Sequence, residues 1–251
     1  MMFYLFTFLC MIHHPIILVP GAFRSQLTVT TEFQKKFPQC PNLTNYPFWI
    51  SPKFLLPNKI SCLLYWLTLD YDENSNSIID QPNITVKTLD FGGVEGIKST
   101  GELFFLQAGY YNRVITELKS YNYVIGENLF GAPYDWRLGI AQKKEFWTNL
   151  THLVESAYNL TNKKVKFLTH SCGGLILHKF LTTETTPEWR KKYIDSAVLS
   201  APSFAGSGAS LVTLYRQRIP YLKFFKNDEL KQMIGSLGAF HVHIPNQKIY
   251  E

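Results

Sequence analysis

The 251-residue sequence is poor in charged residues: they make up only 18% of it, whereas 46% of its residues are hydrophobic. An average soluble domain has about 25% charged residues. The apolar content excludes an intrinsically disordered chain. A chain of this length can form one α/β domain with a sizeable core. Residues 1–12 are apolar and uncharged but too short to span a bilayer, and we interpret them as a signal-like leader.

The sequence also lacks internal repeats, low-complexity tracts and any cluster of metal-ligating residues with convincing spacing. One main domain without a metal or cofactor is therefore expected. The 25 basic residues exceed the 19 acidic ones, which gives a net charge of +6. They are scattered in short clusters such as 190–192, which argues against nucleic acid as a partner. The positive charge is compatible with an anionic lipid surface.

Cysteine is scarce, with four in the chain. Cys10 lies in the leader and Cys172 in a motif described below. Cys40 and Cys62 remain, either as a disulfide formed in an oxidising compartment or as two free buried thiols. The disulfide is favoured because the segment between them is a poor core by itself.

Four asparagines lie in the Asn-X-Thr pattern for N-glycosylation, which favours the secretory pathway and an extracellular or lysosomal location. They are Asn42, Asn83, Asn149 and Asn159.

Three aliphatic runs, at 16–19, 165–169 and 196–200, are typical of buried parallel strands. Between the first two, apolar residues recur at steps of four over 143–158, which predicts an amphipathic helix. Residues 175–181 predict a short apolar helix after the second strand. This alternation of strand and helix indicates an α/β sheet.

Residues 38–97 differ from this pattern, because they are rich in aromatic residues, asparagine and proline and predict no long helix. An apolar cluster in this segment includes Trp49, Leu55 and Leu56. The cluster is either a small satellite core or a lipid-facing surface.

The strongest local motif is Thr-His-Ser-Cys-Gly-Gly at 169–174, between a predicted strand and a predicted helix. This is the context of a nucleophile elbow, in which Ser171 would be the nucleophile and Cys172 would contribute its backbone N–H to an oxyanion hole. Thr169 departs from the G-x-S-x-G pattern, which has glycine there, and an ordinary glycine-containing turn is the alternative. The loop after the first strand would supply the second N–H, from Ala22 or Phe23.

Four blocks of sequence together resemble the lecithin:cholesterol acyltransferase family, from about residue 14 to the end of the chain. They are H-P-I-I-L-V-P-G at 14–21, S-Q-L at 25–27, G-A-P-Y-D-W-R at 131–137 and H-S-C-G at 170–173. The resemblance implies an α/β-hydrolase fold with a lid and a membrane-binding excursion that is closed by a disulfide between Cys40 and Cys62. It also implies Ala22 and Cys172 as oxyanion donors.

The same resemblance implies a reaction at a phospholipid membrane or a lipoprotein surface. The serine would take a fatty acyl group from a phospholipid and pass it to a sterol, another lipid alcohol or water, without a cofactor. Trp49, Leu55 and Leu56 would contact the lipid.

A serine hydrolase of this fold needs an acid and then a histidine after the nucleophile. In the family these two positions fall beyond Glu251, so an α/β-hydrolase fold that is incomplete at its C-terminus is expected. Three hypotheses follow: a fragment of an acyltransferase or phospholipase A, a secreted lipid-binding protein without catalysis, or a rebuilt triad of Asp228 with His241 or His243.

The predicted domain organisation has four parts. They are a leader at 1–12, an α/β-hydrolase core at 13–37 and 98–215, a membrane-binding excursion at 38–97, and the start of a cap or lid region at 216–251.

Overall fold

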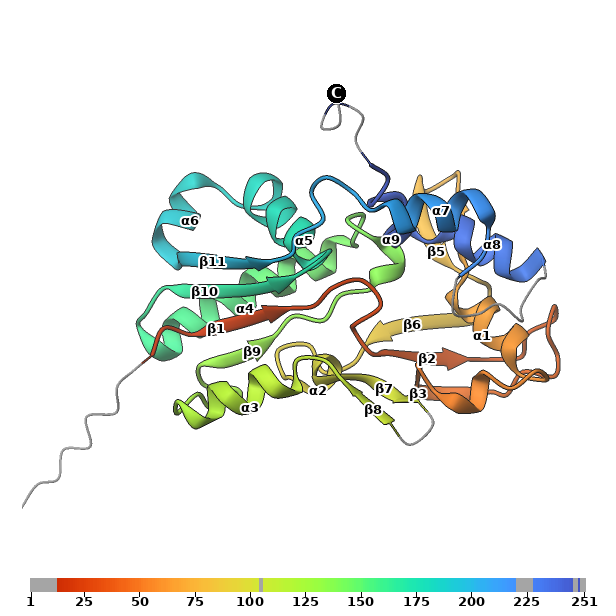
Figure 1. Cartoon of the computed structure of the whole chain (residues 1–251), viewed down its shortest axis with the longest axis horizontal. Coiled ribbons are helices and arrows are strands. Elements are labelled where there is room, and N and C mark those ends of the chain that lie inside the picture. The colour runs from red at the N-terminus through yellow and green to blue at the C-terminus, as the bar shows by residue number, and fades with distance from the viewer. Residues whose placement is uncertain (1–12, 104–105, 220–227, 246–247, 249–251) are drawn as a thin grey trace, which may run out of the picture.

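The computed structural model of the chain describes residues 13–103, 106–219, 228–245 and 248. The predicted leader at 1–12 lies outside the described residues. A parallel sheet with the strand order β11-β10-β1-β9 forms the core (Figure 1). Its strands are β1 (Ile16–Val19), β9 (Leu129–Gly131), β10 (Val165–His170) and β11 (Ile194–Ser200).

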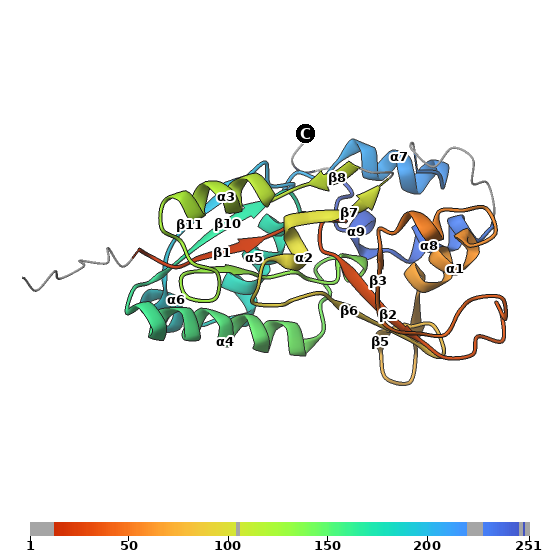
Figure 2. The same ribbon diagram turned by 90° about the horizontal axis from the view of Figure 1, so that it is seen from below.

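Helices cover both faces of this sheet. Ile17 and Val19 of β1 belong to a core cluster with residues of α4 and α5, whereas Leu18 belongs to a second cluster with residues of α2 and α3. Figure 2 shows α3 and α4 on opposite sides of the strands. The bounds are Glu95–Lys98 for α2, Asn112–Ser120 for α3, Lys144–Thr161 for α4 and Gly173–Lys179 for α5.

The structure confirms the three predicted strands and the two predicted helices. The helix predicted at 143–158 is α4, and it is capped at its C-terminus by Asn162, which adopts the left-handed conformation with φ of 50°. The strand β9 was not predicted, because three residues that end in glycine carry no recognisable periodicity.

The prediction that the run at 196–200 is buried was wrong. The run forms a parallel strand, but Val198 is 62% exposed and Leu199 is 40% exposed. The two side chains point to opposite faces of the sheet. They are exposed because β11 is the edge strand and pairs only with β10 in the described part of the chain.

An antiparallel unit adjoins the carboxyl end of β1 (Figure 1). It contains a three-stranded sheet with the order β3-β2-β6 and two hairpins, β4-β5 and β7-β8. Residues 27–31 form β2, which pairs with β3 and β6 of the excursion. The antiparallel unit therefore begins before residue 38, where the excursion was predicted to start. The elements are β2 (Leu27–Thr31), β3 (Leu43–Trp49), η1 (Pro52–Phe54), α1 (Ile60–Leu67), β4 (Leu69–Asp72), β5 (Ser77–Asp80), β6 (Ile84–Thr88), β7 (Ser99–Leu103) and β8 (Leu106–Gly109).

A disulfide closes the excursion, as predicted. It joins Cys40, ahead of β3, to Cys62 in α1, and both residues are buried. The alternative of two free thiols is therefore excluded.

Of the remaining helices, α6 packs against the parallel sheet, where it contacts β11, and α8 packs against the antiparallel unit, where it contacts β4. α8 packs on α1, and α9 packs on η2, whose Trp136 and Arg137 are buried. None of the described helices is both long and apolar enough to cross a bilayer. The bounds are η2 (Trp136–Leu138), η3 (a π-helix, Phe180–Glu184), α6 (Pro187–Tyr193), α7 (Gly208–Arg216), α8 (Asp228–Ser236) and α9 (Gly238–His241).

A buried guanidinium ties the excursion to the core. Arg137 is only 1% exposed, and its Nη2 lies 2.7 Å from Asp80 Oδ1 and 2.7 Å from Asp135 Oδ2. Its Nη1 donates to the Trp66 carbonyl oxygen at 3.0 Å. Since Asp80 and Trp66 belong to the excursion and Asp135 to the core, one side chain holds the two parts together.

We predict that Arg137→Met lowers the free energy of unfolding by about 3–5 kcal/mol, because two poorly exposed carboxylates lose their counter-charge. Denaturant unfolding of the purified protein measures this loss. Arg216→Met, at an exposed position of α7, is the control and should change the free energy by less than about 0.5 kcal/mol. Equal effects of the two substitutions would contradict the role of Arg137.

Candidate active site

Ser171 lies in a sharp turn between β10 and α5. Its φ is +52°, in the left-handed region that residues other than glycine rarely adopt. The Ser171 N–H donates to the Ser200 carbonyl oxygen at 2.9 Å, and the Gly174 N–H donates to the Ser171 carbonyl oxygen at 3.0 Å. The strand, turn and helix therefore have the geometry of a nucleophile elbow.

Two glycines allow the loop after β1 to approach this turn. A Cβ on Gly173 would lie 2.5 Å from the Pro20 carbonyl oxygen and 2.6 Å from the Val19 carbonyl oxygen, too close for any side chain. A Cβ on Gly21 would lie 3.2 Å from the Ser171 Cβ. The two segments are thus packed backbone to backbone.

Thr169 is accommodated although the elbow pattern has glycine at this position. Its side chain is fully buried, and its Oγ1 lies 3.6 Å from the position that a Cβ on Gly174 would occupy. Gly174 is also confined by Pro202, whose Cβ lies 2.9 Å from the same point. Glycine at 174 is therefore required by Pro202, whereas a Cβ there would only make ordinary contact with Thr169.

Two backbone N–H groups beside Ser171 are free among the described residues. Neither the Ala22 N–H nor the Cys172 N–H donates a hydrogen bond to another described group. Free N–H groups on two converging segments are what an oxyanion hole requires.

The Cys172 thiol is unsuited to act as the nucleophile. Its side chain is fully buried, and burial raises the pKa of the thiol to about 11, with a smaller opposing effect from the Tyr134 hydroxyl. The reactive thiolate is therefore scarce at neutral pH.

No histidine in the described part of the chain bonds the Ser171 hydroxyl. His241 Nε2 donates to the Gly235 carbonyl oxygen at 2.8 Å, and the buried His243 bonds the Ala239 carbonyl oxygen through Nδ1 at 2.5 Å. Asp228 pairs with Lys231 at 2.9 Å and has a side chain that is 96% exposed. The structure therefore does not assemble the triad of Asp228 with His241 or His243.

A side chain that sequence reasoning missed contacts both halves of this site. The Tyr110 hydroxyl accepts the Gly21 N–H at 3.0 Å and lies 2.8 Å from His170 Nδ1. Tyr110 follows β8, and no local motif marks it.

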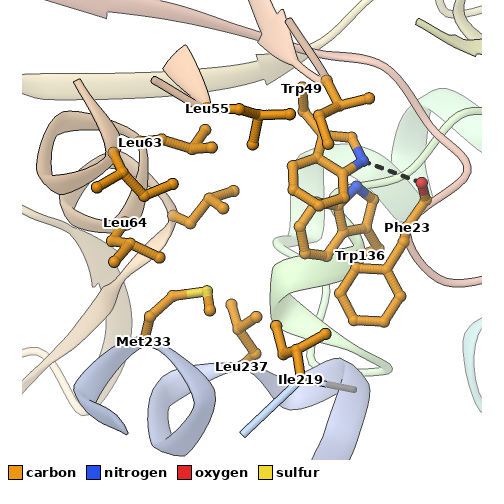
Figure 3. Close-up of a pocket in the computed structure, with 12 residues that line it drawn as sticks. Phe23, Trp49, Leu55, Leu63, Leu64, Trp136, Ile219, Met233 and Leu237 are labelled. Carbon is orange, nitrogen blue, oxygen red and sulfur yellow. Dashed lines mark hydrogen bonds between the residues drawn. The ribbon is translucent and has the colours of Figure 1, made fainter. Parts of the chain in front are cut away.

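An apolar cavity lies beside the loop after β1 (Figure 3). It contains about 390 Å³ of empty space, part of which is open to solvent. The Trp49 Nε1 donates to the Phe23 carbonyl oxygen at 3.0 Å, so the aromatic wall is fixed to the residue that follows Ala22. The lining residues are Phe23, Trp49, Ile50, Leu55, Ile60, Leu63, Leu64, Leu67, Trp136, Ile219, Met233 and Leu237.

The three residues predicted to contact lipid occupy different positions. Trp49 and Leu55 are half-buried and line the cavity, whereas Leu56 is 52% exposed on the outer surface. The neighbouring Phe48 and Phe54 are fully buried. The excursion therefore shares the main hydrophobic core, and it also exposes apolar side chains, of which Leu56 is one.

The four asparagines of the glycosylation pattern are all exposed. Two of them lie within α4. They are Asn42, Asn83, Asn149 and Asn159.

A serine at an elbow above a parallel sheet, with free N–H groups beside it, is the arrangement typical of serine hydrolases of the α/β type. The sequence profile of the family described as lecithin:cholesterol acyltransferase matches residues 46–241, which is more than half of the chain. The chain belongs to the lecithin:cholesterol acyltransferase family.

Individual relatives agree with this assignment. The phosphatidylcholine-sterol acyltransferase of mouse is 28% identical over 242 residues, which is 92% of this chain and 53% of that protein. The human protein of the same name is 27% identical over 225 residues, covering 86% and 50%. The bovine lysosomal phospholipase A and acyltransferase is 26% identical over 218 residues, covering 84% and 53%. The chain thus spans about half the length of these curated relatives.

We predict that Gly173→Ala lowers the free energy of unfolding by about 1–3 kcal/mol, because the new Cβ must displace the loop after β1. Thermal or denaturant unfolding measures the change. Gly235→Ala is the control, since nothing lies within 4 Å of its Cβ position in α8, and it should stabilise the protein by up to about 1 kcal/mol. Similar effects at both positions would argue against the close packing at the elbow.

Proposed function

We propose that this chain carries the nucleophilic half of an acyl-transfer site, in which Ser171 takes a fatty acyl group from a phospholipid. The observation that supports the proposal most is the left-handed turn at Ser171 beside the free N–H groups of Ala22 and Cys172. The family assignment supports the same chemistry, because the names of the relatives describe phospholipase A and acyltransferase activities.

The reaction proceeds in two steps. Ser171 Oγ attacks the carbonyl carbon of a phospholipid ester while a general base removes the hydroxyl proton. The negative charge that develops on the carbonyl oxygen is stabilised by the Ala22 and Cys172 N–H groups. The ester bond breaks, the lysophospholipid leaves as an alcohol after taking up the proton, and Ser171 keeps the acyl group.

The second step releases the acyl group to an acceptor. A hydroxyl of a sterol, another lipid alcohol or water loses its proton to the base and attacks the acyl-serine carbonyl. The product is a new ester or a free fatty acid, and the proton returns to Ser171. The names of the relatives support a sterol or water as the acceptor.

Neither step is fast without the base. The described residues place no histidine on Ser171, and without a base the hydroxyl stays protonated while only the oxyanion hole assists. The acid and the histidine of the family's triad are therefore proposed to come from sequence outside the described residues.

The excursion is proposed to hold the lipid. Leu56 would enter the surface of a phospholipid membrane or lipoprotein, and Trp49 and Leu55 would contact an acyl chain in the cavity. The cavity lies next to the oxyanion loop through Phe23, which both lines it and bonds Trp49. An all-apolar lining suits an alkyl chain and offers nothing to a polar headgroup.

The secretory route, with an extracellular or lysosomal location, is part of the proposal. It is supported by the disulfide between Cys40 and Cys62 and by the exposed asparagines of the glycosylation pattern.

The first test is fatty acid release from phosphatidylcholine liposomes, measured with and without imidazole as an external base. We expect imidazole to increase release by the wild-type chain and Ser171→Ala to reduce it to that of liposomes alone. Ser196→Ala, an exposed serine on β11, is the control and should behave as the wild type. Release that is equal in the wild type and Ser171→Ala would refute the proposal.

A second candidate function is lipid binding without catalysis. The observation in its favour is that the Ser171 hydroxyl has no hydrogen-bond partner among the described residues, whereas the apolar cavity is formed. Imidazole-dependent release separates the two candidates, since only the first predicts it.

Both candidates predict liposome binding through Leu56. We expect Leu56→Asp to weaken co-sedimentation with liposomes about tenfold, because inserting a leucine side chain into lipid is worth about 1.5–3 kcal/mol. The control is Leu160→Asp, which changes a leucine that is 64% exposed on α4. Binding that falls equally in both variants would exclude a specific contact by the excursion.

A further inference from the structure

We propose that Tyr110 is a positioning residue for the oxyanion hole, because its hydroxyl bridges the loop that carries Ala22 and the strand end that carries Ser171. This inference rests on the proposed function of Ser171. It adds a residue that neither the elbow motif nor the four family blocks contain.

The bridge consists of two hydrogen bonds to one oxygen atom. Tyr110 Oη accepts the Gly21 N–H at 3.0 Å and is 2.8 Å from His170 Nδ1. Gly21 directly precedes Ala22, and His170 directly precedes Ser171. The Tyr110 hydroxyl therefore links Gly21, the neighbour of the proposed oxyanion donor Ala22, to His170, the neighbour of Ser171.

The second bond can form with the Tyr110 hydroxyl as the donor. Because Tyr110 Oη accepts the Gly21 N–H through a lone pair, its own hydrogen is available to His170 Nδ1 when that nitrogen is the unprotonated one of a neutral ring. Burial and the nearby Arg24 guanidinium both lower the pKa of His170, which favours this neutral form. Arg24 also lies 5.2 Å from the centre of the Tyr110 ring.

The packing around the bridge leaves little freedom. A Cβ on Gly21 would be 3.1 Å from His170 Nδ1 and 3.2 Å from the Ser171 Cβ. The loop can therefore move away from Ser171 but not closer to it. We infer that the Tyr110 hydroxyl opposes this outward movement and so keeps the Ala22 N–H within reach of the carbonyl oxygen.

Tyr111 provides a matched control. Its hydroxyl donates to the Val19 carbonyl oxygen at 3.0 Å, so it also bonds the start of the same loop. Its side chain is 5% exposed and interacts with the Tyr110 hydroxyl, but it forms no hydrogen bond with His170 among the described residues. Replacing either tyrosine by phenylalanine removes one hydroxyl and keeps the ring, but only Tyr110→Phe breaks the bridge.

The test is the rate at which a fluorophosphonate modifies Ser171 in the full chain, with imidazole present as the external base. Such a probe places a developing negative oxygen in the oxyanion hole. We expect Tyr110→Phe to lower the rate constant about tenfold, less than the complete loss of a donor would. Tyr111→Phe should stay within about threefold of the wild type, and Ser171→Ala sets the background.

A second readout reports the bridge itself. In an NMR titration of the histidine side chains, Tyr110→Phe should raise the pKa of His170, because the neutral ring loses the donor that stabilised it. Tyr111→Phe should leave this pKa unchanged. A general loss of stability would not produce this difference, and unfolding of both variants by heat controls for stability.

The outcomes are separable. Slower modification together with a raised pKa of His170 in Tyr110→Phe alone supports the inference. Equal modification rates in Tyr110→Phe and Tyr111→Phe overturn it and leave the proposed function intact. A wild-type rate no higher than that of Ser171→Ala overturns the proposed function, and with it any role for Tyr110 in positioning.

Discussion

The close packing of the loop after β1 against the elbow is the constraint on which the rest of the site depends. Gly173 lies under the Val19 and Pro20 carbonyl oxygens, and Gly21 lies against Ser171, with no space for a Cβ at Gly173. This packing brings the loop that contains Ala22 close to the turn that contains Ser171 and Cys172. The left-handed backbone of Ser171 costs about 1–3 kcal/mol and persists because these neighbouring segments fix it.

The same loop connects the site to the excursion. Phe23, also in the left-handed region with φ of 64°, bonds Trp49 through its carbonyl oxygen and packs on Trp136 with ring centres 4.5 Å apart. The next residue along η2 is Arg137, which is buried against carboxylates of both units. A displacement of the excursion would therefore reach the loop after β1 through a short series of contacts.

The sequence predicted local features well and the features that depend on distant contacts poorly. Continuous aliphatic runs predicted the strands β1, β10 and β11, because such runs are typical of strands covered on both faces. Apolar residues at steps of four predicted α4, because this spacing places them on one face of a helix. The elbow and the disulfide were recognisable from motifs and from the few cysteines. The exposure of Val198 could not be predicted, because a central and an edge strand have the same composition. Tyr110 was missed because its partners, Gly21 and His170, are far away in the sequence.

The most direct test of the account is to find where the acyl group goes. The chain would be incubated with phosphatidylcholine liposomes and imidazole, quenched in acid, digested and mapped by mass spectrometry. The account predicts a fatty acyl group on the peptide that contains Ser171, and on no other peptide. An acyl group on another residue, or none on Ser171 under conditions in which fatty acid is released, would contradict it.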